Sequence, residues 1–265
     1  MNDALYAGSA RYYATGRLPY PAEIADVLRA GLGLDGRGRL LDVGCGPGPV
    51  TRLLAPLFES AVGVDADAGM IAEARRSGVD GVEWRQLRAE ELPAGLGVFR
   101  VATFAQSFHW MDRPLVARLV RGMLEPGGAW VHVDTSNPSD GTDPLPHPEP
   151  PREAIAALVR RYLGPVRRAG TALLPQGTPS GEAEIMLAAG YAGPERLPAG
   201  GGAVHERSAD QVVASVFSLS SSAPHLFGER FADFERDLRA VLRSASPSGR
   251  FAERSPAIVL VVWRP

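Results

Sequence analysis

Short apolar runs alternate along this chain with longer stretches that carry apolar residues at helical spacing. The first run, Leu40–Val43, leads through a glycine-rich loop into residues 50–58, whose apolar side chains follow a helical period. Later apolar runs predict strands at 61–65, 82–87, 98–105, 129–134, within 196–207, and at 257–263. Strands that alternate with helices favour an α/β fold, in which a doubly wound, mostly parallel sheet has helices on both faces.

Other stretches predict helices, and some have clear start and stop signals. A helix is predicted from Leu115 to Leu124. The Pro-Gly-Gly sequence that follows marks its end, because proline and glycine end helices. Ser180 is expected to cap a helix that runs to residue 189. Further helices are predicted at 66–77, 152–163, 210–219 and 231–244. Residues 137–151 hold six prolines, which indicates a linker or the edge of a lid.

The loop after the first strand has glycine at positions 44, 46 and 48. Glycine tolerates positive φ and lets the backbone approach a ligand closely. A strand, a glycine loop and a helix in this order predict a nucleotide-like ligand at the helix N-terminus. Because position 49 is proline, the G-x-G-x-x-G dinucleotide pattern is incomplete. Asp42 would repel a pyrophosphate, but it could hold loop amides or help to receive a cationic ligand.

The D-x-G-x-G-x-G sequence from Asp42 to Gly48 resembles the first motif of class I S-adenosylmethionine-dependent methyltransferases. The resemblance implies a Rossmann-like sheet of seven strands, the last of them antiparallel, with a helical arm and a helical cap. It also implies S-adenosylmethionine as the cofactor and S-adenosylhomocysteine as the product. The cofactor residues expected from this motif are Asp42, Gly44, Gly46 and Gly48.

A second motif follows at the expected distance. Asp65 ends a short apolar run 19 residues after Gly46, a spacing typical of an acid that hydrogen-bonds ribose hydroxyls. Asp65 matches the family's ribose-binding acid, Ala66 follows it, and Met70 resembles the residue that packs on the adenine face. Alternatives stay open, because an acid at a strand end also caps helices and a helical methionine is usually core filler.

The resemblance covers residues 40–134 motif by motif and 257–263 by position. Ala89 and Glu90, followed by a Leu-Pro sequence, resemble the loop at the adenine edge, although Arg88 stands where many relatives have Asp. Residues 106–112 resemble the Q-x-x-H-W-x-D motif of members that act on small molecules. Gln106 is then expected beside the methionyl part of the cofactor. Phe108 and Trp110 are expected to contact the methyl acceptor.

His109 is the candidate catalytic base, because an unperturbed imidazole titrates near neutral pH. A base helps if the acceptor is a hydroxyl, whereas the leaving thioether needs no acid. The alternative is that His109 only forms part of the pocket wall. His132 and Asp134 share one face of a strand, but nothing supplies further ligands, so no metal is expected.

Residues 11–21 are rich in aromatic and arginine side chains and resemble an arm found in a subset of these enzymes. Such an arm can close over the cofactor and exclude water. Tyr13 and Arg17 are the expected contacts, with Arg17 a partner for the cofactor carboxylate; the alternative is an ordinary surface helix. We expect a single methyltransferase domain over 1–265, with an arm or lid at 1–33 and a cap or lid insertion at 136–180.

The composition of the chain excludes several kinds of site and partner. All 28 basic residues are arginine, which excludes P-loop and Schiff-base lysines. Cys45 is the only cysteine, so an internal disulfide and a zinc cluster are excluded. The net charge of −2 gives no general attraction to nucleic acid. The chain shows neither a signal-peptide pattern nor a long apolar run, so we expect a cytoplasmic protein without membrane partners.

The expected activity is methyl transfer to an O, N or C atom of a small molecule, by a monomer or a homodimer. The arginine bias indicates a GC-rich bacterial source, where such enzymes often act on secondary metabolites. A cyclase-type enzyme that keeps the same cofactor without methylating is one alternative. An NAD(P)-dependent oxidoreductase is another, disfavoured by the incomplete glycine pattern and Asp42. A non-catalytic or nucleic-acid-binding module is disfavoured by the low charge and by the lack of an N/D-P-P-Y tetrad near residue 106.

Overall fold

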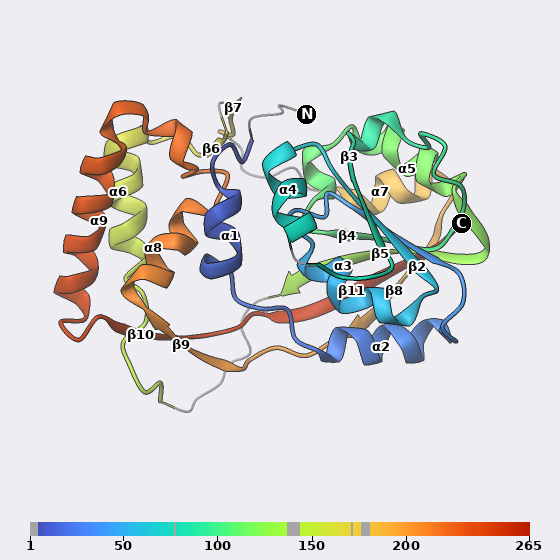
Figure 1. Cartoon of the computed structure of the whole chain (residues 1–265), viewed down its shortest axis with the longest axis horizontal. Coiled ribbons are helices and arrows are strands. Elements are labelled where there is room, and N and C mark those ends of the chain that lie inside the picture. Colours follow the sequence, from blue (N-terminus) through green and yellow to red (C-terminus); the bar gives the residue numbers. More distant parts are fainter. Residues whose placement is uncertain (1–4, 77, 137–143, 171, 176–180) are drawn as a thin grey trace.

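The computed structural model describes residues 5–76, 78–136, 144–170, 172–175 and 181–265. The protein has two lobes (Figure 1), one built on a seven-stranded sheet and one helical, which we call the cap. Segments from both ends of the chain contribute to the cap, so the chain crosses between the lobes several times. Each lobe nevertheless has its own apolar core.

The strands of the large sheet lie in the order β3-β2-β1-β4-β5-β11-β8. They are β1 (Arg39–Val43), β2 (Ser60–Asp65), β3 (Val82–Gln86), β4 (Phe99–Ala105), β5 (Leu124–Ser136), β8 (Ala192–Pro198) and β11 (Ala257–Arg264). Neighbours from β3 to β5 are parallel, whereas β11 is antiparallel to both β5 and β8. The predicted doubly wound sheet with an antiparallel last strand is thus confirmed. The chain winds in opposite directions from β1, and ligands bind at the carboxyl ends of the strands at such a switch point.

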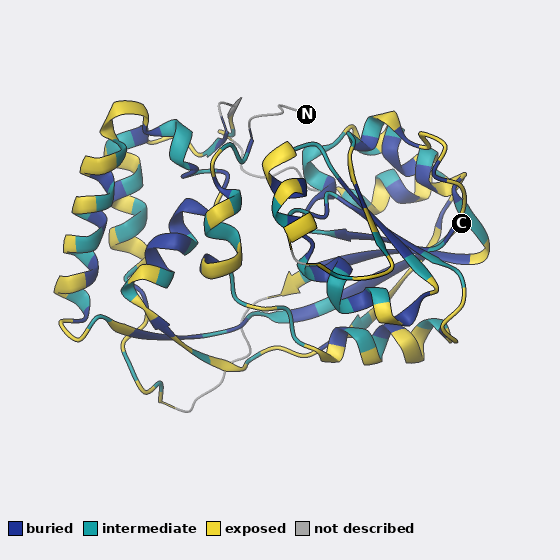
Figure 2. Ribbon diagram, viewed as in Figure 1, coloured by how far each residue is buried: buried dark blue, intermediate teal, exposed yellow. Residues whose placement is uncertain are grey.

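Helices cover both faces of this sheet. They are α2 (Glu23–Leu32), α3 (Pro49–Leu54), α4 (Ala68–Arg76), α5 (Arg113–Arg121) and α7 (Glu182–Ala188). Adjacent strand residues point to opposite faces, so Leu40 packs in a core with Ile24 of α2, while Leu41 packs in another with Val116 of α5. The inner strands are accordingly buried, the edge strands β3 and β8 are largely exposed, and each helix exposes its outer side (Figure 2).

The cap has its own apolar core. It contains α1 (Ala10–Gly16), α6 (Arg152–Leu163), α8 (Ala209–Phe217), α9 (Phe231–Ala245) and the antiparallel pair β9 (Val204–Ser208) and β10 (Arg250–Arg254). Phe217, Phe227 and Phe234 form its centre, with ring centroids 4.0 to 6.1 Å apart. A short hairpin joins β6 (Arg168–Ala169) to β7 (Ala172–Leu173). Among the helices described here, none has the length and apolar character needed to cross a membrane.

Most predicted elements lie close to their expected bounds. The helices expected at 152–163, 210–219 and 231–244 are α6, α8 and α9. The helix expected to reach Leu124 is α5, which ends at Arg121, and β5 already begins at Leu124. The three glycines at 200–202 separate β8, in the large sheet, from β9, in the cap. The sequence did not predict β10.

The expected arm and cap segments distribute over several elements. Residues 5–33 of the arm contain α1, in the cap, and α2, whose Ile24 and Leu28 are fully buried under the sheet. Residues 137–143, 171 and 176–180 lie outside the described residues, and the expected helix cap Ser180 is among them. The described part of 136–180 holds α6 and the β6–β7 hairpin, and the cap also includes elements from 204 to 254. The boundaries of the arm and the cap insertion therefore stay predictions.

Candidate functional site

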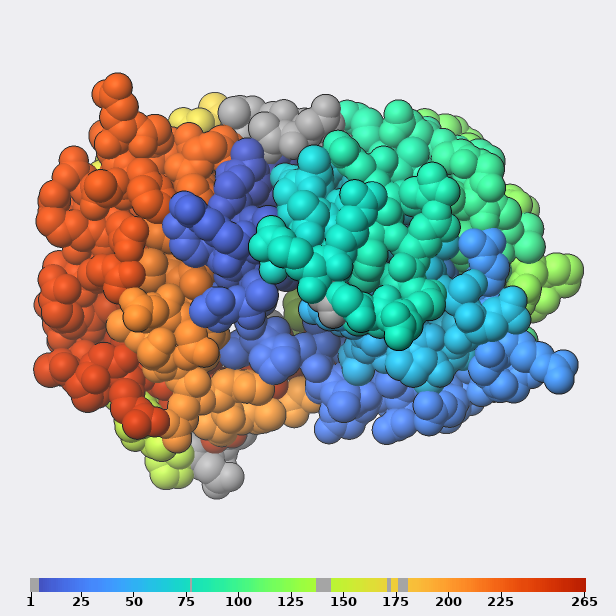
Figure 3. All heavy atoms as spheres, in the orientation of Figure 1, coloured from blue at the N-terminus to red at the C-terminus, as the bar shows by residue number. Residues whose placement is uncertain are grey.

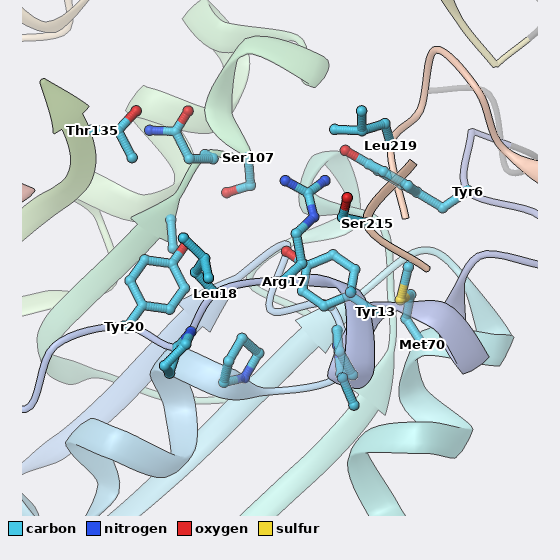
Figure 4. Close-up of a pocket in the computed structure, with 18 of the residues that line it drawn as sticks. Tyr6, Tyr13, Arg17, Leu18, Tyr20, Met70, Ser107, Thr135, Ser215 and Leu219 are labelled. Atoms are coloured by element: carbon cyan, nitrogen blue, oxygen red, sulfur yellow. The ribbon is translucent and has the colours of Figure 1, made fainter. Parts of the chain in front are cut away.

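A cavity of about 860 Å³ lies between the two lobes, at the carboxyl ends of β1, β2 and β4. The sheet lobe contributes the glycine loop and the turns after β2 and β4, while the cap contributes β9, α8 and β10. The N-terminal arm forms a further wall, and Figure 3 shows it in blue between the orange cap and the sheet lobe. Side chains from all three parts point into the same space (Figure 4).

The three loop glycines all have positive φ, with +70° at Gly44, +56° at Gly46 and +80° at Gly48. A Cβ on Gly44 would lie 2.5 Å from the Cβ of Ser107, and a Cβ on Gly48 would collide with the ring of Trp84. A Cβ on Gly46 would meet no atom within 4 Å. Gly44 and Gly46 line the cavity, whereas Gly48 does not. Of the three, Gly46 therefore combines a place in the cavity wall with open space for a ligand.

Asp42 lies beneath this loop, outside the cavity wall. It is fully buried and accepts hydrogen bonds from the hydroxyls of Thr51 at 2.5 Å and Thr103 at 2.9 Å. Burial raises the pKa of Asp42 to about 6, against the opposing effect of these two hydrogen bonds. The carboxyl group of Asp42 thus joins β1 to α3 and β4, and its contact with the cofactor stays a prediction.

Asp65, at the end of β2, does line the cavity. Its Oδ2 accepts the backbone N–H of Gly46 at 2.8 Å, and its Oδ1 accepts that of Asp67 at 2.9 Å. Burial raises the pKa of Asp65, and these two amide bonds oppose that rise. Each carboxylate oxygen can accept more than one hydrogen bond. Asp65 is therefore held against the glycine loop with acceptor capacity left for a ligand with neighbouring hydroxyls.

Three more predicted cofactor residues line the same side of the cavity, namely Ala66, Met70 and Gln106. The side chain of Met70 is 2% exposed, so it packs under the ligand space from α4. Gln106 has a φ of +55°, which is unfavourable for a residue with a Cβ. Its Nε2 donates to the carbonyl of Val133 at 3.3 Å. Strained residues of this kind cluster at ligand sites, which is consistent with the predicted position of Gln106.

The two residues expected at the adenine edge do not line the cavity. Ala89 and Glu90 lie in a short 3-10 helix, η2 (Ala89–Glu91), after β3. Ala89 is 3% exposed and belongs to the core on the α5 side of the sheet. The Oε1 of Glu90 accepts the backbone N–H of Asp112 at 3.0 Å, just before α5. The structure gives both residues a structural role, and their contact with adenine stays a prediction.

The turn after β4 forms another 3-10 helix, η3 (Phe108–Trp110), and its residues point in different directions. Trp110 lines the cavity, as predicted for an acceptor contact. Phe108 is 1% exposed and packs edge-on against Trp130, with ring centroids 5.0 Å apart. The ring of Phe108 thus packs in the aromatic core, and its contact with the acceptor stays a prediction.

His109 is not among the residues that line the cavity. Its ring packs against Trp110 with centroids 4.5 Å apart. Burial, with Arg167 and Arg113 nearby, lowers the pKa of His109 to about 4. The imidazole is consequently neutral at neutral pH, but a role as base requires its side chain to reach the cavity.

The pair considered for a metal lies in the core. His132 is 2% exposed, and its Nε2 accepts a hydrogen bond from the indole of Trp130 at 2.9 Å. Asp134 is hydrogen-bonded by Gln106 at 3.4 Å. In the part of the chain that the structure describes, no group of His, Cys, Asp and Glu side chains is suited to hold a metal ion.

Tyr13 and Arg17 line the cavity from the arm. The guanidinium of Arg17 lies over the ring of Tyr13, with its Cζ 5.1 Å from the ring centroid, and its Nη2 donates to the carbonyl of Ser218 at 3.0 Å. The Nε of Arg17 is buried and has no hydrogen-bond partner among the described residues. A buried donor of this kind is normally satisfied, so Arg17 is suited to an anionic group of a ligand.

Sequence reasoning missed the cap side of the cavity. Figure 4 labels six lining residues that were not named from the sequence: Tyr6, Leu18 and Tyr20 in the arm, Thr135 on β5, and Ser215 and Leu219 in the cap. His205 also lines the cavity, and it is the one histidine of the five in the chain that does. Leu18 and Tyr20 lie in the stretch 11–21 that predicted an arm, whereas no motif marks Ser215, Leu219 or His205, and the change in composition after residue 136 was the only signal for them.

Comparisons with known proteins agree with this geometry. A family model described as a methyltransferase domain matches residues 40–128. The chain is 31% identical over 107 residues to an uncharacterized methyltransferase of Bacillus subtilis, YcgJ. That match covers 38% of this chain and 42% of YcgJ. It is 34% identical over 111 residues to a ubiquinone biosynthesis O-methyltransferase of Pseudomonas aeruginosa. That match covers 40% of this chain and 47% of the relative. The chain thus matches less than half the length of these relatives.

A solved structure extends the likeness to most of the chain. The crystal structure of YcgJ from Bacillus subtilis is 18% identical and covers 92% of this chain and 97% of that one, with a TM-score of 0.52. At this identity the likeness shows the fold alone. The fold agrees with the matched motifs and with the strand order of the large sheet. Residues 40–128 thus match a methyltransferase domain, and the fold of the chain agrees with the resemblance to class I S-adenosylmethionine-dependent methyltransferases.

Proposed function

We propose that this protein transfers the methyl group of S-adenosylmethionine to an O, N or C atom of a small molecule that binds between the sheet and the cap. The observation that carries this proposal is the cavity wall at Gly46 and Asp65. There, open space beside the backbone adjoins a carboxyl group with acceptor capacity to spare. The methyltransferase-domain match of residues 40–128 supports the choice of cofactor.

The residues of the sheet side fit S-adenosylmethionine. Asp65 would accept hydrogen bonds from the two ribose hydroxyls, and the open space at Gly46 would admit the methionyl chain. Met70 would border the adenine ring. The partnerless Nε of Arg17 would donate to the cofactor carboxylate from the arm. These four residues come from separate elements that the fold brings to one edge of the sheet.

When bound, the cofactor supplies a methyl carbon on a positively charged sulfur, which leaves as a neutral thioether. The protein has to hold the acceptor atom in line with the methyl carbon and the sulfur, and to keep water out. Trp110, Tyr20 and Leu219 supply large side chains to the cavity wall for this purpose. A base role for His109 stays a prediction, because it depends on movement of that side chain into the cavity.

The dimensions of the cavity support a small acceptor. Ligand sites in proteins commonly enclose about 300–1,000 Å³. At about 860 Å³ this cavity lies near the upper end of that range. It therefore has room for an acceptor of modest size beside a nucleoside cofactor.

Calorimetric titration with S-adenosylhomocysteine tests the cofactor site. We expect stoichiometric binding by the wild-type protein and binding weaker by at least about tenfold for Asp65→Ala, since hydrogen bonds to a charged group are worth about 1.5–3 kcal/mol each. Asp26→Ala is the matched control, because Asp26 is an exposed residue of α2 outside the cavity wall. Folded wild-type protein that gives no binding heat would contradict the proposal.

A transfer assay tests the reaction. The protein is incubated with S-adenosylmethionine labelled in its methyl group and a small-molecule extract of the source cells. We expect S-adenosylhomocysteine to form and a small molecule to gain the mass of one methylene group. A changed small molecule with no consumption of S-adenosylmethionine would indicate cyclase-type chemistry instead. Label found only in protein or nucleic acid would contradict a small-molecule acceptor.

A further inference from the structure

A buried arginine of the cap connects three chain segments at the cavity wall. Arg207, on β9, is 5% exposed and lines the cavity. Its Nη1 donates to Glu253 of β10 at 2.6 Å. Its Nη2 donates to the carbonyl of Gly16 at 2.7 Å and to the carbonyl of Gln211 at 3.0 Å. A single guanidinium thus joins the antiparallel strands β9 and β10, the start of α8 and the end of α1.

The bond to Gly16 fixes the backbone directly beside a cavity residue. Gly16 is the last residue of α1, and its neighbour in the chain is Arg17, which faces the cavity. A Cβ on Gly16 would lie 2.5 Å from the backbone nitrogen of Ser215, so α1 and α8 are in direct backbone contact there. At the other end of α1, Ser9 donates to the carbonyl of Phe217 at 2.8 Å. Helix α1 is therefore fixed at both of its ends, to α8 and to β9.

We propose that Arg207 is a positioning residue that holds the arm in place, so that Tyr13 and Arg17 form one wall of the cofactor site. The inference rests on the proposed function, because it gives the arm a role in cofactor binding. Arg207 itself contacts the arm backbone and acts through it. The proposal explains why the guanidinium of Arg207 lies at the cavity wall although it is almost unexposed. Its Nη2 donates a hydrogen bond to the carbonyl of Gly16 there.

The shape of the side chain provides the test. The planar fork of arginine reaches Glu253 and the Gly16 carbonyl at the same time, whereas the ammonium of lysine is a single point on a flexible stem. Arg207→Lys is thus expected to keep the charge opposite Glu253 and to lose the bond to the arm. If the arm then spends only part of its time docked, the apparent dissociation constant of the cofactor rises in inverse proportion to that fraction.

The experiment compares Arg207→Lys with Arg239→Lys. Arg239 bridges Asp210 and Glu235 in the same cap but lies outside the cavity wall. S-adenosylhomocysteine is titrated by calorimetry, and limited trypsin digestion, followed by mass spectrometry, measures cleavage after Arg11 and Arg17 without ligand. We expect Arg207→Lys to bind about tenfold more weakly, equivalent to about 1.4 kcal/mol, and to be cut faster at both sites. Arg239→Lys should match the wild type in both measurements.

Wild-type affinity and wild-type protection of the arm in folded Arg207→Lys would overturn the inference while leaving the proposed function intact. Failure of the wild-type protein to bind S-adenosylhomocysteine would instead overturn the proposed function. If far-UV circular dichroism shows that Arg207→Lys does not fold, the same measurements are made on Ser9→Ala, which releases the other end of α1. Unchanged affinity and protection in that variant would also overturn the inference.

Discussion

Alanine at Gly46 and alanine at Gly48 should affect this protein in different ways. Both positions have positive φ, so the backbone strain at either is about 1–2 kcal/mol. At Gly48 the added methyl group would also lie 2.7 Å from Cζ3 of Trp84 and closer still to Cη2. Overpacking of that kind adds about 1–3 kcal/mol. We therefore expect Gly48→Ala to lower the free energy of unfolding by about 2–5 kcal/mol, and Gly46→Ala by only about 1–2 kcal/mol.

Thermal unfolding and calorimetric titration measure the two effects separately. In a chain of this size each kcal/mol corresponds to about 2–4 °C, so Tm should fall by about 4–20 °C for Gly48→Ala and about 2–8 °C for Gly46→Ala. The methyl group at Gly46 takes up space in the cavity wall, so we expect Gly46→Ala to bind S-adenosylhomocysteine at least about tenfold more weakly. Wild-type affinity in Gly46→Ala, or a smaller loss of stability in Gly48→Ala than in Gly46→Ala, would refute this reasoning.

Three further predictions concern buried titratable groups. Burial raises the pKa of Asp42 from 3.8 to about 6, so the folded state favours the protonated form and the wild type loses stability as pH rises through that window, by up to about 3 kcal/mol. Between about pH 4.5 and about pH 7.5, urea unfolding should show a loss of about 2 kcal/mol in the wild type that Asp42→Asn lacks. The same pH dependence of stability in both proteins would contradict this prediction. Since His109 does not line the cavity, His109→Gln should bind S-adenosylhomocysteine like the wild type in calorimetry; a loss of tenfold or more, equivalent to about 1.4 kcal/mol, would show that it touches the site. Burial raises the pKa of the Cys45 thiol well above 9.0, so a thiol reagent should leave the folded protein unmodified at neutral pH and react in urea, whereas rapid reaction of the folded protein would be inconsistent with this burial.

The sheet and the cofactor side could be predicted because their signals are local. The apolar run before Gly44 and the acid at Asp65 lie in two neighbouring strands, and parallel strands end at the same edge of the sheet. A pattern within each short segment is thus enough to bring Gly46 and Asp65 together. The three-glycine break at 200–202 was likewise readable, because a strand cannot continue through it.

A motif read along the chain does not show the direction of each side chain. Phe108 and Trp110 are two residues apart in the same motif. Because they lie in a 3-10 turn, Phe108 packs in the aromatic core while Trp110 lines the cavity. Asp42 precedes the glycine loop, yet its carboxyl group accepts hydrogen bonds from two buried threonines. Both outcomes depend on residues far away in sequence, such as Trp130 and Thr103.

The cap was the least predictable part for the same reason. Tyr6 is distant in sequence from Arg207 and Leu219, and the three meet in the cavity wall because α1 and β9 both pack against α8. Strand β10 escaped prediction because its two central apolar residues, Phe251 and Ala252, are adjacent and do not alternate with polar ones. Long-range packing of this kind leaves no periodic signal in a single sequence.

A crystal structure of the protein with S-adenosylhomocysteine tests the central claim most directly. We expect the ligand across the carboxyl ends of β1 and β2, with its ribose hydroxyls hydrogen-bonded to Asp65, its amino-acid chain beside Gly46 and its sulfur facing the cap. A ligand bound elsewhere, or in this cavity with Asp65 turned away from the ribose, would contradict the claim.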